Sequence, residues 1–214
     1  MKSIVVTNFK GGTGKTFVSV VLAELFMMAE KSVAVVDLDA QLNAVEYLRR
    51  GDGQRLFKNI VPIPAYDKTP DFATLGAYDV VIVDTPPRSF TDAAIRRVLG
   101  AADLVIIPLV LHRHALTAYR DLTAAENDII PRTVPILPVC SVPSQIPKWR
   151  REYLDALLTP ESSGGRALPL VQLPVFNRVD DNLGQKREFW YRLKESEFKP
   201  FSALYDAAAG ALGL

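Results

Sequence analysis

Three glycines, two lysines and two threonines make up a short segment near the start of the chain, Lys10-Gly11-Gly12-Thr13-Gly14-Lys15-Thr16. Glycines let a backbone curl so that successive N–H groups face one anion, at the N-terminus of the following helix. In such a loop Lys15 would reach the β- and γ-phosphates of a nucleotide, and the Thr16 hydroxyl would bind Mg²⁺. The spacing therefore predicts a phosphate-binding loop, although Phe9 replaces the first glycine of the G-x-x-x-x-G-K-T pattern.

Aspartates end two further apolar runs. Asp84 closes VVIVD, and Asp37 and Asp39 close AVVDLD. The carboxyl ends of parallel strands meet at one edge of a sheet, and residues i and i+2 of a strand share a face. We therefore expect all three carboxylates at the phosphate loop, with Asp84 holding Mg²⁺ through its water shell.

Short β-branched runs alternate with helical patterns along the chain, which is typical of a parallel sheet covered on both faces. The prediction is a doubly wound α/β fold in one domain, residues 1–214, with a C-terminal helix at about 200–212 docked on the core. Strands are expected at 3–9, 32–39, 58–65, 78–87, 103–110 and 134–140, and helices after the glycines and at 43–50 and 115–130, with a brief helical turn at 70–77.

Composition narrows the function classes. The net charge of +1 predicts neither a nucleic-acid binder nor an acidic protein, so any contact with DNA needs a local basic patch. One cysteine excludes an internal disulfide, and no Cys/His cluster has metal-site spacing. The longest apolar segment, residues 17–29, is too short for a membrane span and contains Glu24. A soluble, cytoplasmic protein is expected.

Four segments together resemble the ParA/MinD family of deviant Walker-A ATPases: KGGTGKT (10–16), VVDLDAQLNA (35–44), VVIVDTPP (80–87) and DLVIIPL (103–109). The resemblance is clear over about the first 110 residues, and it is closest to the small plasmid-type partition ATPases. It implies a Mg²⁺-dependent ATPase, slow without a partner, that binds ATP or ADP. Two subunits would sandwich two nucleotides face to face.

The resemblance also implies roles for single residues. Lys10 would cross the dimer interface to the partner's phosphate, whereas a solvated loop lysine is the simpler interpretation. Thr16 and Asp84 would serve Mg²⁺, Asp37 would support the metal shell, and Asp39 would position the attacking water. The residues expected to contact the nucleotide are Gly11, Gly12, Thr13, Gly14, Lys15, Thr16, Phe17, Asn177 and Arg178.

Some of these positions depart from the family pattern. Phe17 stands where a second threonine or serine often follows, which should alter packing beside the α-phosphate, and Ala40 replaces a proline. Asn177 and Arg178 either meet the purine or cap a helix. Arg88, after the Asp84 strand, would sense the γ-phosphate or face a partner.

The resemblance favours DNA partitioning: an ATP dimer binds nonspecific DNA, and a ParB-like adaptor protein stimulates hydrolysis. The basic segments 147–153 and 185–199 are candidates for the DNA surface, or are solvated mixed-charge helix faces. Positioning of a protein complex or other cargo is the alternative. A MinD-like membrane switch needs a basic amphipathic tail, which residues after Pro200 lack, and a metabolic enzyme of the same fold is a further alternative. His112 and His114, after the 103–110 strand, suit a loop or helix start rather than catalysis.

Overall fold

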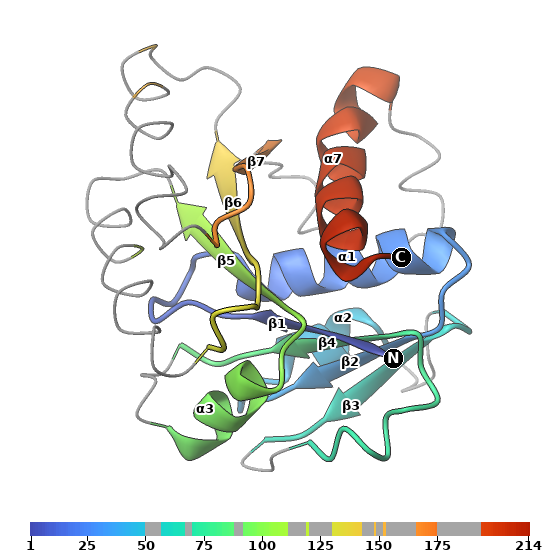
Figure 1. Cartoon of the computed structure of the whole chain (residues 1–214). Coiled ribbons are helices and arrows are strands. Elements are labelled where there is room, and N and C mark those ends of the chain that lie inside the picture. Colours follow the sequence, from blue (N-terminus) through green and yellow to red (C-terminus); the bar gives the residue numbers. More distant parts are fainter. Residues whose placement is uncertain are drawn as a thin grey trace.

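Residues 1–49, 57–66, 70–87, 92–110, 119, 130–142, 148, 152, 166–174 and 194–214 are described by the structure, a computed structural model of the chain. Figure 1 shows a central sheet with helices packed against it. The strands are β1 (Lys2–Val6), β2 (Val33–Asp37), β3 (Ile60–Pro64), β4 (Val80–Asp84), β5 (Leu104–Val110), β6 (Ile136–Val142) and β7 (Val171–Pro174). The helices are α1 (Lys15–Met28), α2 (Asn43–Tyr47), α3 (Ala93–Gly100) and α7 (Glu195–Leu212).

The seven strands form one sheet in the order β3-β2-β4-β1-β5-β6-β7, and every pair of neighbours is parallel. The central strands are buried on both faces, which explains why their sequences are continuous β-branched runs rather than alternating ones. After β1 the chain forms β2, β3 and β4 on one side of that strand, and then β5, β6 and β7 on its other side. The phosphate loop therefore follows the strand at which the sheet changes direction, where open α/β sheets bind ligands.

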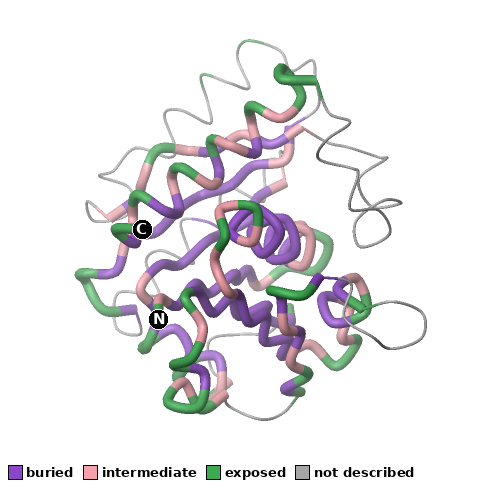
Figure 2. The backbone as a smooth tube through the Cα atoms, turned by 90° about the vertical axis from the view of Figure 1, so that its right-hand side faces the viewer, coloured by how far each residue is buried: buried purple, intermediate pink, exposed green. Residues whose placement is uncertain are grey.

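Helices cover both faces of the sheet. One face, which includes Ile4 and Ile82, packs against α1, α2 and α7, and the other, which includes Val5 and Val83, packs against α3 and Tyr119. Figure 2 shows the strands as the buried centre between exposed outer turns. The predicted doubly wound α/β fold is thus confirmed, and the sheet is entirely parallel over the described strands.

Helix α7 begins at Glu195, earlier than the start expected at about residue 200. The Glu197 carboxylate accepts a hydrogen bond from the Lys194 N–H (2.9 Å) and caps this first turn. Pro200 consequently lies inside the helix. The buried side chains of α7 pack on α1 and the sheet: Phe201, Leu204, Ala208, Ala209 and Leu212. Among the described residues, no helix combines the length and apolarity that a bilayer crossing requires.

Three predicted strands end more than one residue earlier than expected. The run at 3–9 ends as a strand at Val6, the run at 32–39 at Asp37, and the run at 78–87 at Asp84. All three strands stop where the chain turns into a loop at the carboxyl edge of the sheet. Helix α3 and strand β7 were not anticipated, and the helix expected at 115–130 falls outside the described residues except for Tyr119 and Ile130.

Candidate nucleotide-binding site

The glycines of the loop adopt backbone conformations that other residues avoid. Gly12 has φ 69° and Gly14 has φ 90°, both in the left-handed region. Gly14 is the N-cap of α1, and the carbonyl of Gly14 accepts the first helical hydrogen bond, from the Val18 N–H (2.9 Å). The loop thus turns directly into the N-terminus of α1, whose N–H groups and dipole favour an anion.

Lys15 is the first residue of α1, and its side chain is almost entirely buried. The ammonium Nζ donates a hydrogen bond to the carbonyl oxygen of Lys10 (3.0 Å). Burial lowers the pKa of the ammonium, while the charges of Asp84 and Asp39 act in the opposite direction. These two carboxylates therefore lie close enough to Lys15 to offset part of the cost of burying its positive charge.

Asp84 is the last residue of β4 and points toward α1. The Thr16 hydroxyl donates to its Oδ2 (2.8 Å), and the Ser19 hydroxyl lies 3.0 Å from its Oδ1. Asp84 pairs in register with Asp37 of β2, so the two side chains lie side by side. Burial raises the pKa of Asp84 to about 7, with a further contribution from the negative charge of Asp37.

Asp37 makes hydrogen bonds with the turn that follows β2. Its Oδ1 accepts from the Asp39 N–H (2.9 Å), and its Oδ2 accepts from the N–H groups of Ala44 (2.9 Å) and Val45 (3.3 Å) at the start of α2. Burial raises the pKa of Asp37, and these three N–H groups oppose that effect. Asp37 therefore fixes both the turn that carries Asp39 and the entry into α2.

Asp39 lies in that turn, two residues beyond the end of β2. The expectation that Asp37 and Asp39 share a strand face is therefore wrong, because the strand ends at Asp37. The turn nevertheless brings Asp39 near Lys15, as its effect on the Lys15 pKa shows. Its Oδ1 accepts from the Gln41 N–H (3.0 Å), a local bond that orients the half-buried carboxylate.

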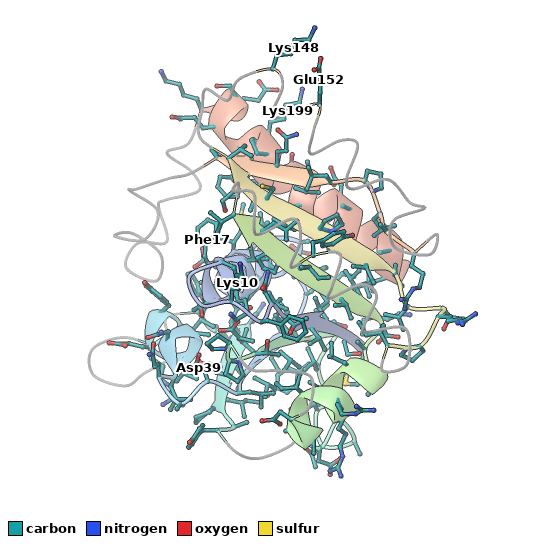
Figure 3. All side chains as sticks on the ribbon, turned by 90° about the vertical axis from the view of Figure 1, so that its left-hand side faces the viewer. Lys10, Phe17, Asp39, Lys148, Glu152 and Lys199 are labelled. Atoms are coloured by element: carbon teal, nitrogen blue, oxygen red, sulfur yellow. The ribbon has the colours of Figure 1, made fainter. Side chains whose placement is uncertain are left out.

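Lys10 and Phe17 flank the loop (Figure 3). The view looks onto the end of α1 at which the loop lies, with Lys10 beside it and Asp39 toward α2. The Lys10 side chain is exposed, whereas Phe17 is half-buried and packs against the core of the α1 face. The aromatic ring at position 17 thus contributes to the core behind the loop.

The donors around Asp84 suit Mg²⁺. Mg²⁺ prefers oxygen ligands and usually takes one or two of them from the protein, keeping waters and substrate phosphates for the rest. Here the Thr16 hydroxyl and the Asp84 carboxylate are 2.8 Å apart. The described residues contain no cluster of three or more His, Cys, Asp or Glu side chains that would form a closed protein cage. The raised pKa of Asp84 marks a buried carboxyl group whose charge a cation would compensate.

Two residues at this edge were missed by sequence reasoning. Ser19 contacts Asp84 and also lies 3.0 Å from the carbonyl oxygen of Lys15, and its signal in the sequence was a hydroxyl between two valines. Asn8 holds the base of the loop by hydrogen bonds to Pro108 and Lys10. The bond to Pro108 depends on which strand lies beside β1, so no local sequence pattern predicts the role of Asn8.

The remaining candidates lie outside the described residues. These are Asn177 and Arg178, proposed for the purine, and Arg88, His112 and His114. The structure places the others, Lys15, Thr16, Asp37, Asp39 and Asp84, at one edge of the sheet.

A phosphate loop between a central parallel strand and a helix, with a buried aspartate on the neighbouring strand, defines a P-loop nucleotide-binding domain. Residues 4–195 match the family described as the CobQ/CobB/MinD/ParA nucleotide binding domain, and the chain belongs to that family. The resemblance to ParA/MinD proteins is thereby confirmed.

Two characterised relatives show sequence similarity over part of the chain. The maintenance of carboxysome distribution protein A of Gloeobacter kilaueensis is 35% identical over 109 residues, covering 49% of this chain and 47% of that protein. The chromosome-partitioning ATPase Soj of Thermus thermophilus is 30% identical over 158 residues, covering 60% of this chain and 63% of Soj. The matches thus span about half to five-eighths of the relatives' lengths.

Solved structures show the same fold over the whole chain. The Cyanothece McdA–ATP complex has a TM-score of 0.73 at 17% identity and covers 100% of this chain and 97% of its own. The structure of pNOB8 ParA bound to nonspecific DNA has a TM-score of 0.65 at 17% identity, with coverages of 99% and 98%.

Proposed function

We propose that the chain is a ParA-like ATPase whose ATP-bound form is a homodimer and whose hydrolysis cycle drives DNA partitioning. The observation that carries the proposal is the pairing of a buried phosphate lysine, Lys15, with an exposed lysine, Lys10, on one loop. Lys15 lies within its own site, next to Asp84 and Asp39. Lys10 instead presents its side chain at the surface, where a second subunit can meet it.

The residues divide the work of phosphoryl transfer. The N–H groups of residues 11–16 and the Lys15 ammonium would bind the β- and γ-phosphates. Thr16 and Asp84 would hold Mg²⁺, which neutralises charge on the phosphates when bound. Asp37 would support the metal site indirectly, since its oxygens already accept hydrogen bonds from three backbone N–H groups. Asp39, on the turn that Asp37 fixes, is the carboxylate we assign to the attacking water.

Lys10 would complete the site only on dimerisation. A cation supplied in trans stabilises the charge that develops on the transferring phosphoryl group, as an arginine finger does. ATP would then hold two subunits together, and hydrolysis would release them. Basal hydrolysis is expected to be slow, so that a ParB-like adaptor can set its rate.

DNA is the cargo that we favour. Soj is a chromosome-partitioning ATPase, and pNOB8 ParA has the same fold and was solved on nonspecific DNA. Lys148 and Lys199 lie at one end of the molecule in Figure 3, away from Lys10. The Lys148 side chain is 90% exposed and forms an ion pair with Glu152 at 3.5 Å, and such an exposed pair is weak enough to yield to phosphate.

Positioning of a protein complex is the second candidate. The carboxysome distribution protein supports it, because it has the highest identity of the two relatives compared above. Such a function would use the same ATP dimer. A membrane switch has less support, since the apolar face of α7 is packed on the core and its last turn carries no basic residue.

Sedimentation velocity with ATP and Mg²⁺ tests the dimer. We expect ATP to convert monomer to dimer, Asp39→Ala to trap the dimer, and Lys10→Ala to lose it while still binding a fluorescent ATP analogue. Lys58→Ala, which removes another exposed lysine remote from the loop, is the matched control and should dimerise normally. Unchanged mass of Asp39→Ala with ATP would refute the nucleotide sandwich.

Binding to nonspecific DNA across a salt series separates the two cargoes. Partitioning predicts that the protein binds DNA only with ATP. The logarithm of the association constant should fall linearly with the logarithm of the salt concentration, because Lys and Arg contacts to DNA phosphates release counterions. Lys148→Ala with Lys199→Ala should reduce that slope. Absence of binding at low salt, with the ATP dimer intact, would favour a protein complex as cargo.

A further inference from the structure

The hydrogen-bond ladder between β1 and β5 does not stop where β1 ends. The last paired residues are Val6 and Ile106, and the Thr7 N–H still donates to the Ile106 carbonyl (3.0 Å). The next β5 carbonyl on that side belongs to Pro108, because residues i and i+2 of a strand point their carbonyls the same way. The chain, however, leaves the sheet for the phosphate loop before a main-chain N–H reaches it.

The Asn8 side chain occupies that position. Its Nδ2 donates to the Pro108 carbonyl (2.8 Å), and its Oδ1 accepts from the Lys10 N–H (3.0 Å). Asn8 is 3% exposed, so the bond to Pro108 is shielded from competing water, and the bond from the Lys10 N–H is partly shielded. One amide thus supplies the missing rung of the ladder and anchors the first residue of the loop to β5.

The Lys10 backbone is held at both its polar groups. Asn8 accepts from its N–H, while its carbonyl accepts from Lys15 Nζ (3.0 Å) and from the Thr13 hydroxyl (3.4 Å). The base of the loop is fixed from the other side as well, since the Thr85 hydroxyl donates to the Val6 carbonyl (2.9 Å). Lys10 therefore combines a fixed backbone with an exposed side chain.

We infer that Asn8 is a positioning residue that sets the direction in which Lys10 meets a second copy of this chain. The inference rests on the proposed function, in which Lys10 acts in trans. A long lysine side chain loses conformational entropy when it binds. Because the Lys10 backbone is already fixed, its ordering adds no further entropy cost to association. Asn8 makes no phosphate contact in this scheme, and its effect falls on dimerisation rather than on nucleotide binding.

The test measures two dissociation constants in the Asp39→Ala background, where ATP persists. The first is the dissociation constant of a fluorescent ATP analogue from the monomer, measured at low protein concentration. The second is the dissociation constant of the dimer at saturating ATP, measured by sedimentation. Asn8→Ala should raise the dimer constant about tenfold, equal to about 1.4 kcal/mol, and change the nucleotide constant by less than about threefold.

Two further variants make the test specific. Ser3→Ala removes a buried β1 hydroxyl that bonds Ala101 and Asp103, at the opposite end of the strand, and should leave both constants unchanged. Asn8→Ser keeps an oxygen that can accept from the Lys10 N–H but is too short to reach β5, so its dimer should be intermediate in affinity. It also replaces Asn8→Ala should that variant fail to fold.

The outcomes separate the two proposals. A parent protein that stays monomeric with ATP overturns the proposed function, and with it this inference. If the Asp39→Ala parent dimerises with ATP and both Asn8 variants have the same dimer dissociation constant as that parent, the inference alone is overturned. Parallel loss of nucleotide and dimer affinity would also overturn it, because Asn8 would then support the loop as a whole.

Discussion

Asp84→Asn tests the electrostatics of the site most directly. The pKa of Asp84 rises from its usual 3.8 to about 7 on folding. At about 1.4 kcal/mol for each pKa unit, the ionised carboxylate destabilises the fold by about 4 kcal/mol when no cation is bound. Asparagine has the same shape and cannot ionise, so the variant should be more stable than the wild type at alkaline pH.

The sign of the pH dependence follows from proton binding. Below pH 3.8 the folded and unfolded states both carry the proton, and above about pH 7 neither does. Between these values only the folded state keeps it, so wild-type stability falls as the pH rises. The stability advantage of Asp84→Asn should therefore grow by about 3 kcal/mol from pH 5 to pH 8 and then level off.

Urea denaturation at several pH values, with EDTA and without nucleotide, measures this difference. Asp79→Asn is a suitable control, because hydrogen bonds from Ser32 lower the pKa of that exposed carboxylate and keep it ionised above pH 5. Its difference from the wild type should be constant over the range. A constant difference for Asp84→Asn as well would refute the argument that burial beside Asp37 raises the pKa of Asp84.

Three other variants test separate features. Gly14→Ala should lower stability by about 1–2 kcal/mol and weaken nucleotide binding, since φ 90° is strained for alanine, whereas Gly11→Ala should leave urea stability unchanged. Ser19→Ala should raise the Mg²⁺ concentration for half-maximal nucleotide binding about tenfold in a titration, and an unchanged midpoint would contradict its contact with Asp84. Phe201→Ala should cost about 3–5 kcal/mol in urea denaturation, and a loss below about 1 kcal/mol would show that α7 is not docked on the core.

The sequence was sufficient to predict the fold and to predict that most candidate site residues lie at one edge of the sheet, because both depend on local patterns. The run VVIVD identifies a central strand, and parallel strands end at one edge, so Asp84 had to lie near the loop. The position of Asp39 depends on hydrogen bonds between Asp37 and residues further along the chain. Asp37 bends the chain by accepting from N–H groups up to eight residues away, which ends β2 before Asp39.

Other omissions have different causes. Helix α3 carried a readable signal, with Ile95, Val98 and Leu99 on one face and Asp92 as its N-cap, accepting from the Ala94 and Ile95 N–H groups (2.9 and 3.3 Å). Asn8 carried none. Its partner lies 100 residues away, and the pairing follows from the order of strands in the sheet.

The prolines of β3 bear on how such a protein avoids unwanted assembly. The Ala65 N–H donates to the Asp37 carbonyl, so the odd-numbered residues of β3 face β2, and the N–H positions of residues 62 and 64 face away from the sheet. Both are proline, which removes the donors that another strand would use to extend the sheet. The proposed ATP-dependent dimer would benefit from this, because an edge with fewer donors recruits other strands less readily and leaves association to the phosphate loop.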